Sequence, residues 1–261
     1  MLKHDPNKDW EKYGEDDPYY AVVSLDRFQR DNLNPELLTE FFETGRQHIE
    51  YVLSTIRSHV DPNFKPGKAL DFGCGVGRCT IPMAQVCESV TGVDVSTAML
   101  KEGEKNAASK GLTNVEWVHS NDLGAVKGSF NFVHSFIVFQ HIPEENGLAI
   151  LSKIVDLLAD DGIGSLHFLY NKDTSRFKQF LGRLRVKVPL ANNFANLFYG
   201  RPFGYPLVQK NAYSLNKILN LLQKKKCGNC HIRLEGIREF QGAVVFFQKR
   251  PDAVPYDQLY K

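Results

Sequence analysis

Residues 68–84, KALDFGCGVGRCTIPMA, place three glycines at alternate positions directly behind a short apolar segment. The apolar segment, residues 68–72, has the composition of a buried strand, and a helix is predicted after Gly77. Gly73 and Gly75 lie in the turn between the two. Because glycine has no Cβ, such a turn can bring backbone N–H groups close to a ligand. The segment therefore predicts a strand-to-helix turn beside a bound molecule.

Further strands and helices are predicted on both sides of this turn. Four more apolar segments, rich in β-branched and aromatic residues, read as buried strands at residues 89–94, 115–120, 130–137 and 164–170. Helices are predicted from Asn34 to Val60, after Gly77, from Ser96 to Gly111 and from Pro143 to Gly162. Strands that alternate with helices predict an α/β fold with a doubly wound, mostly parallel sheet.

The pattern changes after residue 170. Residues 171–212 contain Gly, Pro and aromatic residues without periodicity and are predicted as an insertion, and a helix follows at residues 214–226. Residues 231–240 and 243–250 then flank Gln241-Gly242 like an antiparallel hairpin. We expect one domain over residues 61–261, preceded by an N-terminal arm and helix over residues 1–60 that cap the site.

Composition limits the class of protein. A chain of 261 residues with 43% hydrophobic and 24% charged residues can bury a large core. The first 20 residues are polar and acidic, unlike a signal peptide, and no apolar run is long enough to span a bilayer. We therefore expect a cytoplasmic protein with no membrane partner, whose five cysteines are free thiols. The N-terminal aromatic residues indicate either a lid or an arm that only packs; they are Trp10, Tyr13, Tyr19 and Tyr20.

Charge is unevenly distributed, although the formal net charge is only +2. Residues 1–170 contain 15 Lys and Arg against 25 Asp and Glu, whereas residues 171–250 contain 16 against 3. The basic segment is compatible with a phosphorylated small substrate, a solvated surface or RNA, which we rank in that order because no RNA-binding module is recognisable. If RNA binds, its phosphates should meet Lys172, Arg176, Lys178, Arg183, Arg185 and Lys187.

Cys227-Gly-Asn-Cys230-His231 matches the C-x-x-C-H spacing of haem attachment and half of a zinc site. The chain shows neither an export signal nor a second pair of ligands with metal-site spacing. We therefore predict a helix-to-strand turn here, with no haem, and no metal in the protein.

Polar residues follow the second and third predicted strands. Asp94 ends the second strand, beside the glycine turn, where a carboxylate can accept hydrogen bonds from both hydroxyls of a ribose. Asn121 and Asp122 follow the third strand, where they suit an adenine amino group, and Leu123 suits its ring face. A dinucleotide fingerprint would need glycine at position 78, where this chain has Arg78. The three strand ends therefore predict a nucleoside site rather than a diphosphate site.

With this combination of segments, the sequence resembles the class I S-adenosylmethionine-dependent methyltransferases. Their successive motifs are matched by LDFGCGVG, VTGVDVSTAML, SNDL and FNFVHSFIVFQHIP, over roughly residues 65–170. The resemblance implies a Rossmann-like fold with seven strands, the last antiparallel, and S-adenosyl-L-methionine as cofactor. Asn131 departs from the acidic residue common in the family, but it lies at the start of its strand, away from the ligand edge.

The resemblance also implies roles for single residues. Gly73, Gly75 and Gly77 would line the methionine and ribose, Asp94 would hold the ribose, and Asp122 would mark the adenine. Asp71 would orient the glycine turn or take the amino group of the cofactor. The other implied cofactor-binding residues are Val95, Met99, Asn121, Leu123, Ser135 and Phe136.

The exit of the fourth strand faces the reactive methyl group in this family. Ser135, Phe136, Gln140 and His141 lie there, and the titration range of His141 suits a general base for a hydroxyl acceptor. The alternative is a histidine that only hydrogen-bonds to a loop. We expect methyl transfer to a small-molecule acceptor; the alternatives are an RNA methyltransferase, a nicotinamide-dependent oxidoreductase and a non-catalytic cofactor-binding domain. The sequence leaves open whether oxygen, nitrogen or carbon is methylated.

Overall fold

The computed structural model describes residues 6–126, 128–174, 181–182, 184–185, 188, 190–200, 202–237 and 239–250. Its strands are β1 (Lys68–Phe72), β2 (Ser89–Asp94), β3 (Val115–His119), β4 (Phe130–Ser135), β5 (Leu158–Lys172), β6 (Cys227–Ile237) and β7 (Phe240–Lys249). They form one seven-stranded sheet in the order β3-β2-β1-β4-β5-β7-β6. β1 to β5 pair in parallel, whereas β7 is antiparallel to both β5 and β6. The predicted α/β sheet with an antiparallel last strand is confirmed.

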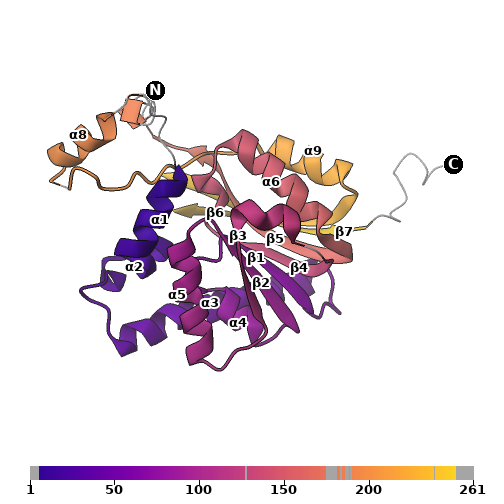
Figure 1. The fold of residues 1–261 in the computed structure, drawn as a ribbon. Coiled ribbons are helices and arrows are strands. Elements are labelled where there is room, and N and C mark those ends of the chain that lie inside the picture. The colour runs from indigo at the N-terminus through magenta and orange to yellow at the C-terminus, as the bar shows by residue number, and fades with distance from the viewer. Residues whose placement is uncertain are drawn as a thin grey trace.

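Helices cover both faces of this sheet (Figure 1). They are α1 (Pro6–Asp16), α2 (Pro18–Val23), α3 (Pro35–His59), α4 (Thr80–Ala84), α5 (Thr97–Ser109), α6 (Glu144–Asp156), α8 (Ala191–Phe198) and α9 (Leu215–Lys224). One buried cluster packs α3 and α4 against the sheet, with Val52 and Met83 on Phe132. A second packs α6 and α9 against the other face, with Ile154 and Leu222 near the strands. None of the helices in the described residues has both the length and the hydropathy to cross a bilayer.

Local capping explains where two of the helices begin. The side chain of Asn34 accepts a hydrogen bond from the Leu37 N–H at 2.9 Å, and Pro35 is the first residue of α3. The Ser96 hydroxyl accepts from the Met99 N–H at 3.1 Å and starts α5. These two helices therefore begin where the sequence predicts.

The predicted helix from Pro143 to Gly162 is wrong in its C-terminal part. α6 ends at Asp156, and β5 already begins at Leu158. Gly162 does not end a helix; it lies inside β5 beside a register shift, after Asp161 in a left-handed conformation with φ of 59°. A Cβ on Gly162 would lie 2.9 Å from the Ala159 carbonyl oxygen. Glycine therefore allows the backbone to pack closely at this irregular point of the strand.

Two predictions about the C-terminal hairpin are also wrong. Cys227, Cys230 and His231 lie within β6, around an irregularity in its pairing with β7, and do not form a helix-to-strand turn. Gly242 does not form the hairpin turn either, because β7 already begins at Phe240. A Cβ on Gly242 would lie 2.6 Å from Nε2 of His167, so this glycine makes room for a neighbouring side chain.

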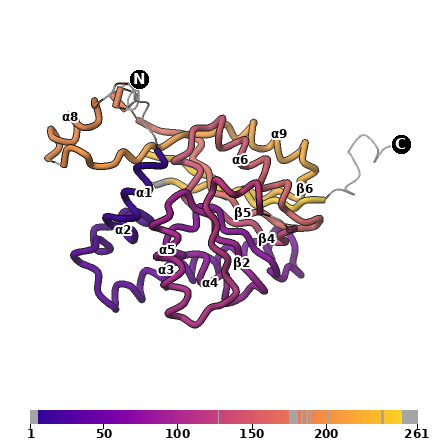
Figure 2. Tube along the Cα trace, in the orientation of Figure 1, coloured from indigo at the N-terminus to yellow at the C-terminus, as the bar shows by residue number. Residues whose placement is uncertain are grey.

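The N-terminal residues form two helices that the sequence analysis did not predict. α1 packs on the start of α5, where a Cβ on Gly14 would lie 2.5 Å from the Ser96 Oγ. Figure 2 shows α1 beside the segment that follows α8, and the Lys12 ammonium donates to the Gly204 carbonyl oxygen at 2.8 Å. Within the predicted insertion at 171–212, β5 extends to Lys172 and α8 spans residues 191–198.

Candidate functional site

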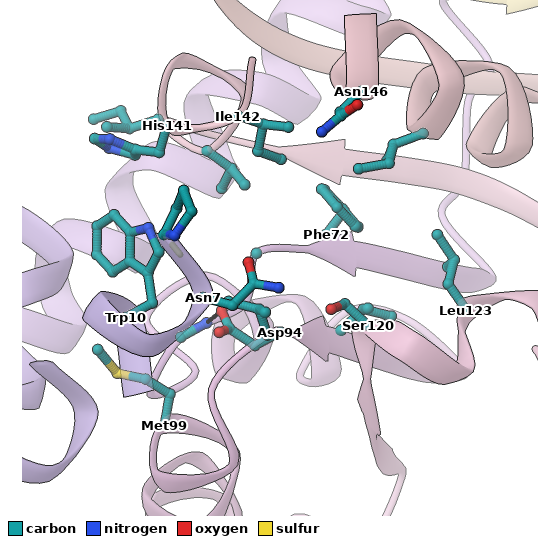
Figure 3. A pocket seen from close by; sticks show the side chains of 18 of the residues that line it. Asn7, Trp10, Phe72, Asp94, Met99, Ser120, Leu123, His141, Ile142 and Asn146 are labelled. Carbon is teal, nitrogen blue, oxygen red and sulfur yellow. Dashed lines mark hydrogen bonds between the residues drawn. The ribbon is translucent and has the colours of Figure 1, made fainter. Parts of the chain in front are cut away.

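A cavity of about 960 Å³ lies at the carboxyl ends of β1 to β4 (Figure 3). The first three strands contribute Phe72, Gly73, Gly75, Val93, Asp94, Val95, Ser120, Asn121 and Leu123, and α5 contributes Met99. The segment after β4 and the start of α6 contribute Phe136, Ile137, Val138, His141, Ile142, Pro143, Asn146 and Ile150. Pro6, Asn7 and Trp10 of α1, Ala21 and Val22 of α2, and Gln209 complete the lining. The cavity therefore lies where parallel sheets bind ligands.

The glycine turn forms the floor of this cavity and is held by the end of β2. The backbone N–H groups of Gly73 and Cys74 donate to the Val93 carbonyl oxygen at 2.7 and 3.0 Å. Gly73 has φ of 76° and Gly75 has φ of 52°, and a Cβ on Gly73 would collide with Val138. These N–H groups already donate within the protein, so they do not form a cradle for a diphosphate.

Asp94 connects the glycine turn to α5. Its Oδ2 accepts from the Gly75 N–H at 2.8 Å, and its Oδ1 accepts from the Ser96 N–H at 3.0 Å. Burial raises the pKa of Asp94, while the two backbone donors favour the charged form. Each carboxylate oxygen has a further lone pair that can accept from a ligand hydroxyl.

The third strand end lies in a short 3₁₀ helix, Ser120–Ala125. Asn121 and Leu123 line the cavity, as does Ser120, which the sequence analysis did not select. Asp122 is exposed and is not among the lining residues. The imidazole of His119 lies 2.8 Å from the Val95 carbonyl oxygen and ties β3 to the end of β2.

The cavity brings together most of the residues selected from the sequence: Gly73, Gly75, Asp94, Val95, Met99, Asn121, Leu123, Phe136 and His141. Asp71 and Ser135 lie beneath it and are fully buried. The Asp71 carboxylate accepts from the Thr80 hydroxyl at 2.6 Å, and the Ser135 hydroxyl donates to the Phe72 carbonyl oxygen at 2.8 Å. Gly77 has φ of 87° and packs against Trp117, away from the cavity.

Residues distant in sequence form the roof over the end of the cavity near β4. Trp10 packs edge-on against His141, with ring centroids 4.8 Å apart. The sequence left open whether Trp10 belongs to a lid or to an arm that only packs, and in the structure it lines the cavity. Asn7 and Gln209 carried no sequence signal, because only the packing of α1 and of the segment after α8 brings them to the cavity.

His141 is neutral and held by a loop. Its Nδ1 lies 2.7 Å from the Gln209 carbonyl oxygen, which can only accept, so Nδ1 carries the proton. Its Nε2 therefore has a lone pair, and it lies 3.0 Å from the Gln140 side-chain nitrogen. Burial lowers the pKa of His141 to about 4. The predicted alternative of a loop hydrogen bond is thus present in the structure, and it orients the lone pair of Nε2.

Comparison with known proteins identifies the type of domain. The profile of a methyltransferase domain family matches residues 69–162, which run from β1 into β5. The structure of a magnesium protoporphyrin IX methyltransferase from Synechocystis, with bound S-adenosylmethionine, is similar with a TM-score of 0.59 and 18% identity. That similarity covers 95% of this chain and 99% of the other.

Residues 69–162 thus match a methyltransferase domain, and the seven-stranded sheet has the fold of the class I S-adenosylmethionine-dependent methyltransferases. A second structure of this type, a putative sarcosine dimethylglycine methyltransferase from Galdieria sulphuraria, has a TM-score of 0.54 and 13% identity, covering 80% of this chain and 86% of that one. The family match and the sheet order favour a methyltransferase domain over the alternative of a nicotinamide-dependent oxidoreductase.

Sequence relatives of this chain match over short segments. A 23S rRNA (uracil(1939)-C(5))-methyltransferase from Marinomonas posidonica is 30% identical over 93 residues, 36% of this chain and 21% of that protein. The corresponding protein of Pectobacterium carotovorum is 43% identical over 54 residues, 21% of this chain and 12% of that protein. The chain thus spans about a fifth or less of the length of these relatives.

Proposed function

We propose that this methyltransferase transfers the methyl group of S-adenosylmethionine to a small-molecule acceptor bound under the N-terminal arm. The observation that carries this proposal is the cavity at the strand ends, whose volume of about 960 Å³ lies at the upper end of the usual range for ligand sites. One end is built from strand ends and polar groups, and the other is roofed by Trp10 of α1. The cavity thus has room for a cofactor and a small acceptor side by side.

In this proposal the strand ends hold the cofactor. Asp94 accepts hydrogen bonds from the ribose hydroxyls with its remaining lone pairs. Gly73 and Gly75 let the methionine part approach the backbone, because a side chain at either position would fill the floor of the cavity. Asn121 and Leu123 contact the adenine edge and ring. Asp71 supports the glycine turn from beneath through Thr80 rather than by touching the cofactor.

The acceptor occupies the end near β4, beneath α1 and Gln209. Its walls are largely apolar, with Trp10, Val138 and Ile142 among the lining residues. These walls exclude water from the methyl group during its transfer. For a hydroxyl acceptor, His141 is the base: the Gln209 carbonyl fixes the proton on Nδ1, and Nε2 accepts from the acceptor hydroxyl in place of the Gln140 side-chain nitrogen. The arm over residues 1–60 and the insertion at 171–212 are therefore the parts that select the acceptor.

RNA is the second candidate, and the rRNA methyltransferases among the partial matches are its support. The lining of the cavity argues against it, because the residues named above include Asp94 but no Lys or Arg to meet a phosphate. Of the six basic residues expected to contact RNA, Arg176, Lys178, Arg183 and Lys187 lie outside the described residues. Arg185 donates to the Asn192 side-chain oxygen at 2.7 Å, on the way to α8.

A thermal-shift experiment tests the cofactor part of the proposal. S-adenosylhomocysteine should raise the melting temperature of the purified protein, because it binds only the native state, whereas NAD should not. Stabilisation by NAD alone would refute it. A screen of hydroxylated and phosphorylated small molecules with methyl-labelled cofactor then identifies the acceptor.

A further inference from the structure

Three nitrogen and sulfur donors converge beneath the glycine turn, outside the cavity. His48 comes from α3, Cys79 directly precedes α4, and His134 lies on β4. One ligand atom from each lies within 4.8 Å of the others, and none of the three residues lines the cavity. Among the described residues this is the one group of three or more potential ligands drawn together in this way.

His134 is oriented by a buried carboxylate. Its Nδ1 lies 2.8 Å from the Asp71 Oδ1, and the other Asp71 oxygen accepts from the Thr80 hydroxyl at 2.6 Å. Asp71 and His134 are 2% and 1% exposed. A carboxylate on Nδ1 keeps the proton there and presents the lone pair of Nε2, which is how metal-binding histidines are commonly held.

The second imidazole faces that lone pair. Nε2 of His48 lies 3.0 Å from Nε2 of His134, so the two rings approach through their ligand nitrogens. The ring of Phe136 packs on His48 with centroids 4.0 Å apart and fixes its orientation. At this distance the two nitrogens can share a proton in an N–H···N hydrogen bond or can both donate a lone pair to a cation. The nearby Cys79 sulfur is a third donor atom, which the hydrogen bond does not need but a metal ion does.

We propose that His48, His134 and Cys79 bind one Zn²⁺. Two imidazoles and one thiolate are a ligand set that suits this ion. On binding, Cys79 releases its thiol proton to solvent, and the sulfur and the two Nε2 atoms each donate a lone pair to the ion. The thiolate and the Asp71 carboxylate offset the +2 charge of the ion. The Arg78 guanidinium, whose central carbon lies 5.9 Å from the centroid of the Phe136 ring, acts against binding.

The position of the site predicts a structural role. The ion fastens α3 to β4 and to the residue that leads from the glycine turn into α4. It is separated from the cavity by Phe136, which both lines the cavity and packs on His48. Metal removal should therefore loosen the N-terminal half of the fold without removing any group that touches the acceptor.

Metal analysis and cobalt substitution of the full chain test this site. Purified wild type, dialysed against metal-free buffer, should retain about one equivalent of zinc, and Co²⁺ added to the stripped protein should give a thiolate-to-metal absorption band. Cys79→Ser should lose the band. Cys87→Ser, a buried cysteine of the same core, and Cys230→Ser, in the C-x-x-C-H segment, should both keep it.

If Cys79→Ser does not fold, the wild type and Cys230→Ser together decide the outcome. The site is supported if a chelator lowers the melting temperature of the wild type, Zn²⁺ restores it, and Cys230→Ser keeps the thiolate band. Absence of the band in the wild type, or its loss in Cys230→Ser and not in Cys79→Ser, overturns the proposal, because no metal then binds at these residues.

Discussion

Asp94→Asn is the substitution that probes the cofactor site most sharply. In the structure both carboxylate oxygens accept from the backbone, from Gly75 and from Ser96, and each has a lone pair left for a ribose hydroxyl. Asparagine keeps one acceptor oxygen and replaces the other with an NH₂ group that faces an N–H donor. A hydrogen bond to a charged group contributes about 1.5–3 kcal/mol, so S-adenosylhomocysteine should bind about ten- to a hundredfold more weakly.

Titration calorimetry with S-adenosylhomocysteine measures this loss, with Glu104→Gln as the matched control. Glu104 is an exposed carboxylate on α5, so its removal changes the charge near the site without touching the cavity. The melting temperature of each variant without ligand separates lost affinity from lost structure. Asp94→Asn binding within about twofold of wild type would refute the assignment of Asp94 to the ribose.

Three further predictions concern the cavity floor and roof. Gly73→Ala should lower the free energy of unfolding by about 2–4 kcal/mol, and Gly111→Ala should lower it by about 1 kcal/mol. Both glycines have a positive φ, but only a Cβ at Gly73 would collide with a neighbour. Equal losses of the two variants in urea denaturation would contradict this reasoning. Trp10→Ala should raise the acceptor KM by roughly tenfold and leave the melting temperature shift by S-adenosylhomocysteine nearly unchanged. His141→Gln should slow the methylation of a hydroxyl acceptor by roughly a hundredfold. The rate of the wild type should decline as pH falls through about 4, because His141 gains its proton there. A decline near pH 6.5 instead would exclude His141 as the base.

The same histidine predicts how stability responds to pH. Its pKa is about 4 in the folded protein and near 6.5 in the unfolded chain, so the unfolded state binds the proton first as pH falls. The contribution of His141 to stability is therefore complete above pH 6.5 and is lost between about 6.5 and 4. Urea denaturation of wild type and His141→Gln across this range measures it, and parallel curves would contradict the buried, neutral state.

Features set by neighbouring residues were predictable from the sequence. Asn34 and Ser96 cap their helices through bonds to residues three positions later, and the glycine turn follows from its own residues. The strand ends at Asp94 and Asn121 meet because parallel strands share one carboxyl edge. This is why the fold and most of the selected residues that line the cavity could be named in advance.

Features set by packing between distant segments were not predictable. In the sequence, Gly162 resembles a residue that ends a helix, and Gly242 resembles part of a hairpin turn. In the structure, each glycine instead leaves room for an atom that lies too close for a side chain to fit. Asp71 is buried under the turn because His134, 63 residues later, contacts its carboxylate. Trp10 and Gln209 meet at the cavity only after α1 docks against the segment that follows α8.

Methyl transfer from labelled S-adenosylmethionine, followed by separation of the products by size, tests the central claim most directly. The purified protein is incubated with a small-molecule extract and with total RNA, each at low and high salt. The account predicts label in the small-molecule fraction, with turnover that is insensitive to salt because no phosphate backbone is bound. Label confined to RNA and falling steeply with salt, or no transfer to either fraction, would contradict it.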